Sequence, residues 1–109
     1  MKVAKYTETE ATLELPGVLK REVINASDGA PNFCMRVFDL EPGSSTPSHS
    51  HAWEHEVYIL TGKGVVESED GEKEISRDTV VFVAPDEHHR FRNTSFDTLR
   101  FICVIPLES

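Results

Sequence analysis

The chain has 109 residues, of which 39% are hydrophobic, and a formal net charge of −8 with the histidines counted as neutral. This length is that of one small domain with a narrow margin of stability, to which a bound metal or a partner subunit would add. The negative charge argues against binding to nucleic acid, whose phosphates favour a basic surface, and equally against an anionic membrane surface.

The two cysteines lie inside apolar runs, Phe33-Cys34-Met35 and Ile102-Cys103-Val104. Such positions are typical of buried thiols in a reducing compartment, and two cysteines are too few for a disulfide framework. No N-terminal apolar run resembles a signal peptide, and no run is long enough to span a bilayer. We therefore expect a cytoplasmic protein with no membrane partner.

Residues 1–32 predict an N-terminal arm. They mix Thr, Glu and Lys with Pro16 and Gly17, so we expect a loosely structured segment with one or two short strands. The turn signal Asp28-Gly29-Ala30-Pro31 lies near its end. Residues 33–109 form the expected barrel, and the whole chain is one structural domain because no linker or internal repeat divides it.

The remainder of the chain predicts strands. The first, Phe33 to Leu40, is apolar on both faces, so we expect it to be covered on both sides. Asp70-Gly71 favours a tight hairpin between two charged strands, which we expect at a solvent-exposed edge. Strands recur at about eight to twelve residues, which predicts an all-β sandwich or barrel with little or no helix. The later strands are expected at Glu54–Thr61, Val65–Glu69, Glu72–Ile75, Thr79–Ala84, His89–Asn93 and Leu99–Ile105.

The five histidines fall into two clusters, and their spacing indicates a metal site. His49 and His51 are two residues apart, and such residues share a face of an extended chain. His55 follows at the start of the next strand, on the opposite face from Glu56. Three histidines within seven positions at strand spacing are uncommon by chance, whereas imidazole is the commonest metal ligand in proteins.

The second cluster contains two adjacent histidines, His88 and His89. His89 shares a face with Phe91, and His88 shares one with Arg90 and Arg92. Because two arginines favour water or a partner surface over a barrel interior, we expect His89 to point inward and His88 to be solvated.

These residues carry the signature of a known family. The run from Gly43 to Gly62 resembles the first cupin motif, which is a glycine, five residues, His-x-His, three or four residues, an acidic residue and a later glycine. The run from Pro85 to Asn93 resembles the second motif, although Glu87 replaces the usual glycine and the gap to the histidine is one residue shorter. The resemblance covers about residues 33 to 106 and implies a small single-domain cupin of type 2. Its fold would be a double-stranded β-helix, the jelly-roll barrel.

The resemblance also implies a set of metal ligands. Cupins commonly use three histidines and one glutamate, and His55 and Glu56 both have an allowed spacing after His51. The sequence from His49 to Val57 looks like that of the small cupins in which histidine replaces the glutamate. Strand alternation does not show which face is inward, so Glu56 remains the alternative. The favoured ligands are His49, His51, His55 and His89.

Such a site would hold one divalent ion per chain, which could be Mn, Fe, Zn, Ni or Cu, because imidazole binds all of them. Four neutral imidazoles leave the full +2 charge of the ion, whereas a glutamate would reduce it to about +1 and weaken the Lewis acid. The open side of the metal should be apolar. The candidate walls of this substrate pocket are Phe91, Phe101, Cys103 and Ile105.

The family implies dioxygenation, isomerisation or cyclisation of a small organic molecule. A four-histidine site beside an apolar wall suits an aromatic, enolic or polyketide-like substrate, and we expect a dioxygenase-like oxidoreductase. A metal-dependent cyclase or isomerase and a non-catalytic sensor or binding barrel remain as alternatives. The apolar outer faces of Phe33–Leu40 and Val80–Val83 need another cover, so we also expect a homodimer.

Overall fold

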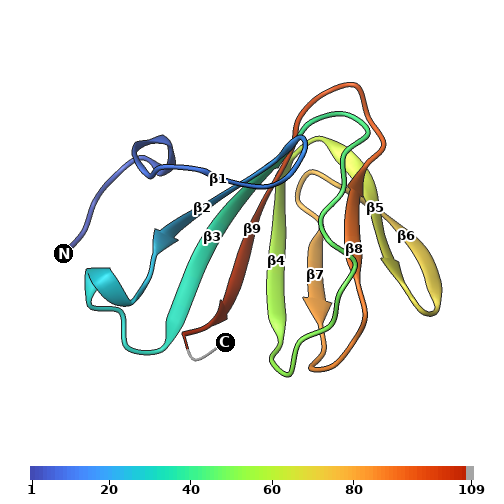
Figure 1. Cartoon of the computed structure of the whole chain (residues 1–109). Coiled ribbons are helices and arrows are strands. Elements are labelled where there is room, and N and C mark those ends of the chain that lie inside the picture. The colour runs from blue at the N-terminus through green and yellow to red at the C-terminus, as the bar shows by residue number, and fades with distance from the viewer. Residues whose placement is uncertain (108–109) are drawn as a thin grey trace.

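The computed structural model describes residues 1–107, which form strands and two single-turn 3-10 helices (Figure 1). This arrangement confirms the predicted all-β fold. No helix in this part of the chain is long and apolar enough to cross a membrane. The elements are η1 (Tyr6–Glu8), β1 (Thr12–Leu15), β2 (Val18–Ile24), η2 (Ala26–Asp28), β3 (Phe33–Leu40), β4 (His55–Thr61), β5 (Lys63–Ser68), β6 (Gly71–Ser76), β7 (Val80–Val83), β8 (Arg90–Asn93) and β9 (Leu99–Pro106).

Two antiparallel sheets form a jelly-roll-like barrel. The larger has six strands in the order β1-β2-β3-β9-β4-β7, and the smaller has three in the order β6-β5-β8 (Figure 1). The segment between β3 and β4 runs beside β8 and forms two isolated bridges there, one from Ser45 to Arg92 of β8 and one from His49 to His89, the residue just before β8. The segment that carries His49 and His51 is thereby held beside His89.

Period-two alternation decides which side chains form the interior. On β9, Leu99, Phe101 and Cys103 are buried, while the residues between them face outward. Phe101 pairs in register with Phe38 on β3, and their rings stack with centroids 5.0 Å apart. The core therefore lies between the inward faces of the two sheets, as expected for a half-buried antiparallel barrel.

The N-terminal segment is more regular than its composition indicates. β2 pairs with β3 from Val18↔Leu40 to Ile24↔Met35, and the Val18 side chain is fully buried. The charged residues of β2 made it hard to recognise in the sequence. In the fold they form ion pairs with residues of the neighbouring strands, Lys20 with Glu14 at 2.6 Å and Arg21 with Asp39 at 3.2 Å.

The charged hairpin lies where the sequence predicts it. β6 is an edge strand of the smaller sheet, and it pairs with β5 from Lys63↔Ser76 to Ser68↔Gly71. Gly71 has a φ of 111°, a conformation that L side chains rarely adopt, which explains the glycine at this turn.

Asn93 ties three parts of the barrel together. Its side chain is 1% exposed, and its Nδ2 donates to the carbonyls of Leu40 at 2.9 Å and Asp97 at 2.7 Å. Its Oδ1 accepts a hydrogen bond from the backbone N–H of Ser95 at 2.8 Å. The end of β8 is thus joined to the end of β3 and to the loop before β9.

We expect Asn93→Ala to lower the free energy of unfolding by about 2–3 kcal/mol, because it removes the buried hydrogen bond to the Leu40 carbonyl and the second one to Asp97, and also removes buried side-chain volume. Urea unfolding of the metal-free protein measures this change. The exposed neighbour gives a matched control, Thr94→Ala, whose effect should stay within about 0.5 kcal/mol. Equal small losses in both variants would contradict the assigned role of Asn93.

Candidate metal centre

Four histidines converge inside the barrel. His49 and His51 come from the segment between β3 and β4, His55 begins β4, and His89 directly precedes β8. The ring centroids lie 4.2 Å apart for His49 and His51, 4.6 Å for His55 and His89, and 5.0 Å for His49 and His89. The bridge between His49 and His89 brings the two clusters together, with backbone N–H to O distances of 2.9 and 3.2 Å.

The structure distinguishes His55 from Glu56, the choice that the sequence left open, and places His88 and His89 differently. His55 is 4% exposed and its ring lies 5.3 Å from that of His51, whereas Glu56 is exposed on the outer face of the large sheet. His89 is also 4% exposed. His88 lies at the rim, where its Nε2 is 2.6 Å from the hydroxyl of Ser48. His55 and His89 are therefore the members of each pair that face the cluster.

The ring nitrogens of His89 and His55 indicate that these side chains fit a metal ion. The Nδ1 atom of His89 lies 3.0 Å from the carbonyl of Glu87. A carbonyl only accepts, so Nδ1 carries the proton and the Nε2 of the neutral ring keeps its lone pair for a ligand. The Nδ1 atom of His55 is buried with no hydrogen-bond partner. An orphaned imidazole nitrogen in a cluster of imidazoles fits a divalent ion.

The side chains are gathered but not arranged as a finished coordination shell. Within residues 1–107, no three His, Cys, Asp or Glu side chains already stand so that they could hold a metal ion. The ring centroid of His51 lies 5.3 Å from that of His55 and 6.4 Å from that of His89, so His51 is the member that is set apart from these two. Trp53 stacks on His51 with ring centroids 4.4 Å apart, which fixes one face of that ring. Metal ligation by these four residues stays a prediction.

Burial keeps the four imidazoles neutral. It lowers the pKa of His49 to about 4 and that of His55 to about 3, with further lowering by the neighbouring histidines and Arg36. Burial also lowers the pKa values of His51 and His89. The neutral form, which is the form that ligates metals, is therefore the form present at pH 7.

A cavity of about 180 Å³ adjoins the histidines. Three phenylalanines form much of its wall: the Phe101 ring lies 5.0 Å from that of Phe38 and 4.8 Å from that of Phe91. Cys103 lines the cavity as well. Ile105, the fourth expected wall residue, instead packs against the core and is not among the lining residues.

Sequence reasoning missed two lining residues on β3, Arg36 and Phe38. The signal was present in the alternation, because Arg36 shares a face with Cys34 and Phe38 on a strand expected to be covered on both sides. Glu14 also lines the cavity, and nothing in its charged surroundings in the sequence marks it.

Known proteins resemble this chain in sequence and fold. A family model described as "Cupin domain" matches residues 36–105. The polyketide cyclase RemF from Streptomyces resistomycificus has a similar structure, with a TM-score of 0.91 and 31% identity over 98% of this chain and 80% of that chain. A predicted oxalate decarboxylase from Thermotoga maritima follows with a TM-score of 0.83 and 26% identity, over 97% of this chain and 99% of that one.

A curated protein from Thermotoga maritima described as "Oxalate-binding protein" is 39% identical over 69 residues, or 62% of this chain. The match spans 57% of that relative's own length.

The lowered histidine pKa values predict that the metal-free protein loses stability in acid. Below about pH 6.5 these histidines take up protons in the unfolded state, whereas in the folded state His49 and His55 stay neutral until about pH 4 and 3. The free energy of unfolding should therefore fall as the pH drops from about 6.5 to 4, by up to about 1.4 kcal/mol per pH unit for each such histidine.

Urea unfolding with a chelator at pH 7, 6 and 5 measures this slope. His55→Gln removes one of the neutral histidines and should reduce the slope. Identical slopes for the wild type and for His55→Gln would show that the burial of His55 does not govern its protonation.

Proposed function

This chain belongs to the cupin domain family, and we propose that it is a metal-dependent enzyme that cyclises a small enolic, aromatic or polyketide-like substrate. The single observation that carries the proposal is the aromatic cavity lined by three neutral histidines, His49 and the buried His55 and His89. The likeness to a polyketide cyclase over 98% of the chain favours cyclisation within this class. Dioxygenation, expected from the sequence, stays a prediction that the same experiments test.

The proposed ligands are His49, His51, His55 and His89, which together would hold one divalent ion. When bound, such an ion supplies Lewis acidity that polarises a carbonyl oxygen of the substrate. The all-imidazole set suits Zn, Fe, Ni, Cu or Mn and leaves the charge of the ion undiminished.

The chain's own residues supply binding, orientation and exclusion of water. Phe38, Phe91 and Phe101 offer ring faces on which a flat, conjugated substrate can stack. All three rings are buried, and a substrate stacked on them would be shielded from water, which strengthens electrostatic interactions with it. Glu14 is the carboxylate at the cavity wall, and we assign its Oε2 as the proton acceptor for enolisation, since its Oε1 already contacts the ammonium of Lys20 at 2.6 Å.

Removing any proposed ligand should remove the metal. We expect His49→Ala, His51→Ala, His55→Ala and His89→Ala each to reduce bound metal strongly, while His88→Ala and Glu56→Gln retain it. Elemental analysis measures the content, and the fluorescence of Trp53, the single tryptophan, follows titration with Zn²⁺ because its ring stacks on His51. Full metal content in His55→Ala together with loss in Glu56→Gln would replace the four-histidine set with the glutamate set.

The reaction is tested with a synthetic poly-β-keto thioester and the metal-loaded protein. We expect a cyclised, dehydrated product at equal rates with and without O₂, and a rate more than about tenfold lower in His55→Ala, since even residues that only support a metal ligand have effects of that size. A product that contains oxygen from O₂ would instead establish dioxygenation and end the cyclase proposal.

A small-molecule-binding role without catalysis is the second candidate. A curated relative described as "Oxalate-binding protein", which is 39% identical over 62% of this chain, favours this candidate. Saturable binding of oxalate to the metal-loaded protein, with no turnover of the oxalate or of the poly-β-keto substrate, would support this candidate over an enzyme.

We also propose that the protein is a cytoplasmic homodimer. The cysteines Cys34 and Cys103 are free and buried, as in a reducing compartment. On the outer face of the large sheet, Tyr58, Val80 and Phe82 are 42%, 70% and 61% exposed. Such a row of large apolar side chains needs a cover, and residues 1–107 do not provide one.

Sedimentation of the metal-loaded protein at low micromolar concentration should show a dimer, with an interface above about 1,000 Å². Phe82→Glu should shift it toward monomer because it would bury a charge at the interface, and its metal content should not change. A monomeric wild-type boundary would contradict the dimer.

A further inference from the structure

Arg36 is a cation placed on the inward face of the barrel. It lies in the middle of β3, in register with Cys103 on β9, and its side chain lines the cavity beside the histidines. The alternation of β3 puts it on the same face as Phe38 and Leu40, both buried in the core. An arginine at such a position costs desolvation free energy unless something compensates its charge.

The contacts of the guanidinium are weak for a partly buried charge. Its Nη2 donates to the thiol of Cys103 at 2.9 Å, and its Cζ lies 5.1 Å from the centroid of the Phe38 ring. The Nε atom is buried and has no hydrogen-bond partner. A neutral sulfur and an aromatic face hold the group in place without neutralising it.

The other arginines have the partners that Arg36 lacks. Arg21 and Arg100 contact Asp39, while Arg90 and Arg92 contact Glu67. Arg77 is exposed to water. Among residues 1–107, Arg36 is thus the arginine that is neither exposed nor paired with a carboxylate.

Glu14, which lines the same cavity, does not supply the missing charge. Its carboxylate contacts the ammonium of Lys20 at 2.6 Å, and no ion pair joins it to Arg36 in the described chain. The cavity is therefore lined by a planar cation without a carboxylate partner, beside phenyl faces and three of the four histidines, His49, His55 and His89.

We propose that Arg36 binds an oxyanion of the substrate, a carboxylate or an enolate oxygen, and thereby selects planar anions over their neutral analogues. The guanidinium fork matches a carboxylate in geometry and charge, and the adjacent phenyl rings accept the flat body of the same molecule. The assignment deepens the proposed function, because it rests on this cavity being the substrate site, and it names the class of substrate as anionic.

Binding of benzoate and of its neutral isostere benzamide tests the proposal by calorimetry. The metal-free protein isolates the contribution of Arg36 from ligation by a metal, and the Zn-loaded protein is measured alongside it. We expect the metal-free wild type to bind benzoate about tenfold or more tightly than benzamide, because a charge-assisted pair is made with one and not with the other.

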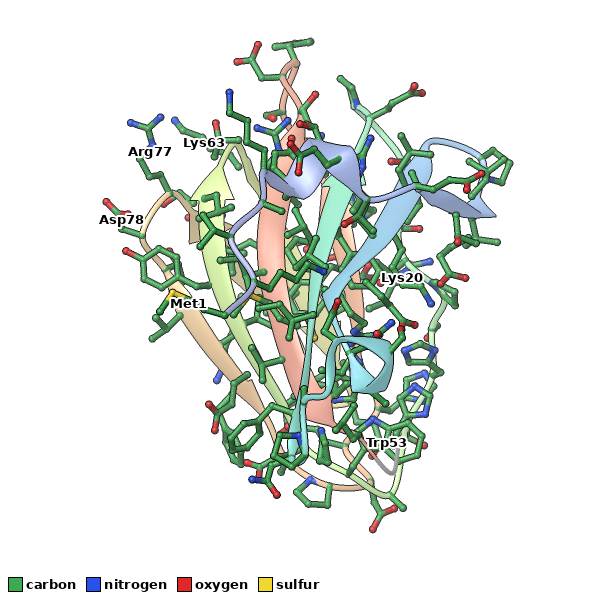
Figure 2. The ribbon with its side chains drawn as sticks, turned by 90° about the vertical axis from the view of Figure 1, so that its left-hand side faces the viewer. Met1, Lys20, Trp53, Lys63, Arg77 and Asp78 are labelled. Carbon is green, nitrogen blue, oxygen red and sulfur yellow. The ribbon has the colours of Figure 1, made fainter. Side chains whose placement is uncertain are left out.

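Arg36→Gln should abolish this preference without lowering metal content, and Arg36→Lys should reduce it because the fork is lost. The matched control is Arg77→Gln, which should keep the full preference. Figure 2 shows Arg77 at the opposite end of the molecule from Trp53, which stacks on the histidine cluster. Thermal unfolding of each variant checks that it is folded.

Equal affinities for benzoate and benzamide in the metal-free wild type would overturn the proposal, whatever the variants do. So would a preference that persists in folded Arg36→Gln. A protein that discriminates through Arg36 but neither binds metal nor turns over substrate would keep this inference and lose the proposed function. A metal-loaded cyclase without the discrimination would keep the function and lose this inference.

Discussion

The pairing of the segment after β3 with β8 is the constraint on which the rest of the site depends. The reciprocal backbone hydrogen bonds of His49 and His89 continue a short ladder that includes Thr46 N–H to the Phe91 carbonyl at 2.9 Å and Asn93 N–H to the Ser44 carbonyl at 3.0 Å. Because these bonds fix the register, the side chains of His49 and His89, which belong to motifs far apart in the sequence, meet in the histidine cluster. Asn93 closes the ladder at its other end. A segment with almost no regular secondary structure is in this way hydrogen-bonded along its length to residues 89–93.

The interior of the barrel combines neutral nitrogen donors with one uncompensated cation. Burial keeps the histidines unprotonated, and the nearby charge of Arg36 further lowers their pKa values. The charge of Arg36 in such surroundings attracts anions. The free energy lost by burying these groups without full partners is the kind of local cost that binding of a metal or an anionic ligand would offset.

The strands β3, β9 and β4 serve two surfaces at once. Their inward residues, including Phe38, Phe101 and His55, form the cavity and the histidine cluster. Their outward residues, including Tyr58 and Ile102, form an apolar face that the barrel leaves partly open. Since alternation couples the two faces rigidly, a change in the packing of the outer face would reach the site through a shift of the same backbone.

The sequence by itself determined the all-β class, the bounds of β3 and the pairing of the two strands of the charged hairpin, because period-two patterns and turn residues are local signals. It also determined which histidines are spaced as a set. The arginines that share a face with His88 also predicted that His89 is the inward member of that pair. Only the tertiary structure decided that His55 rather than Glu56 faces the interior, because alternation defines two faces without saying which is covered. The same limit applies to Arg36 and to β2. Their charged residues suggest solvent-exposed positions in the sequence, but strands distant along the chain surround them in the fold.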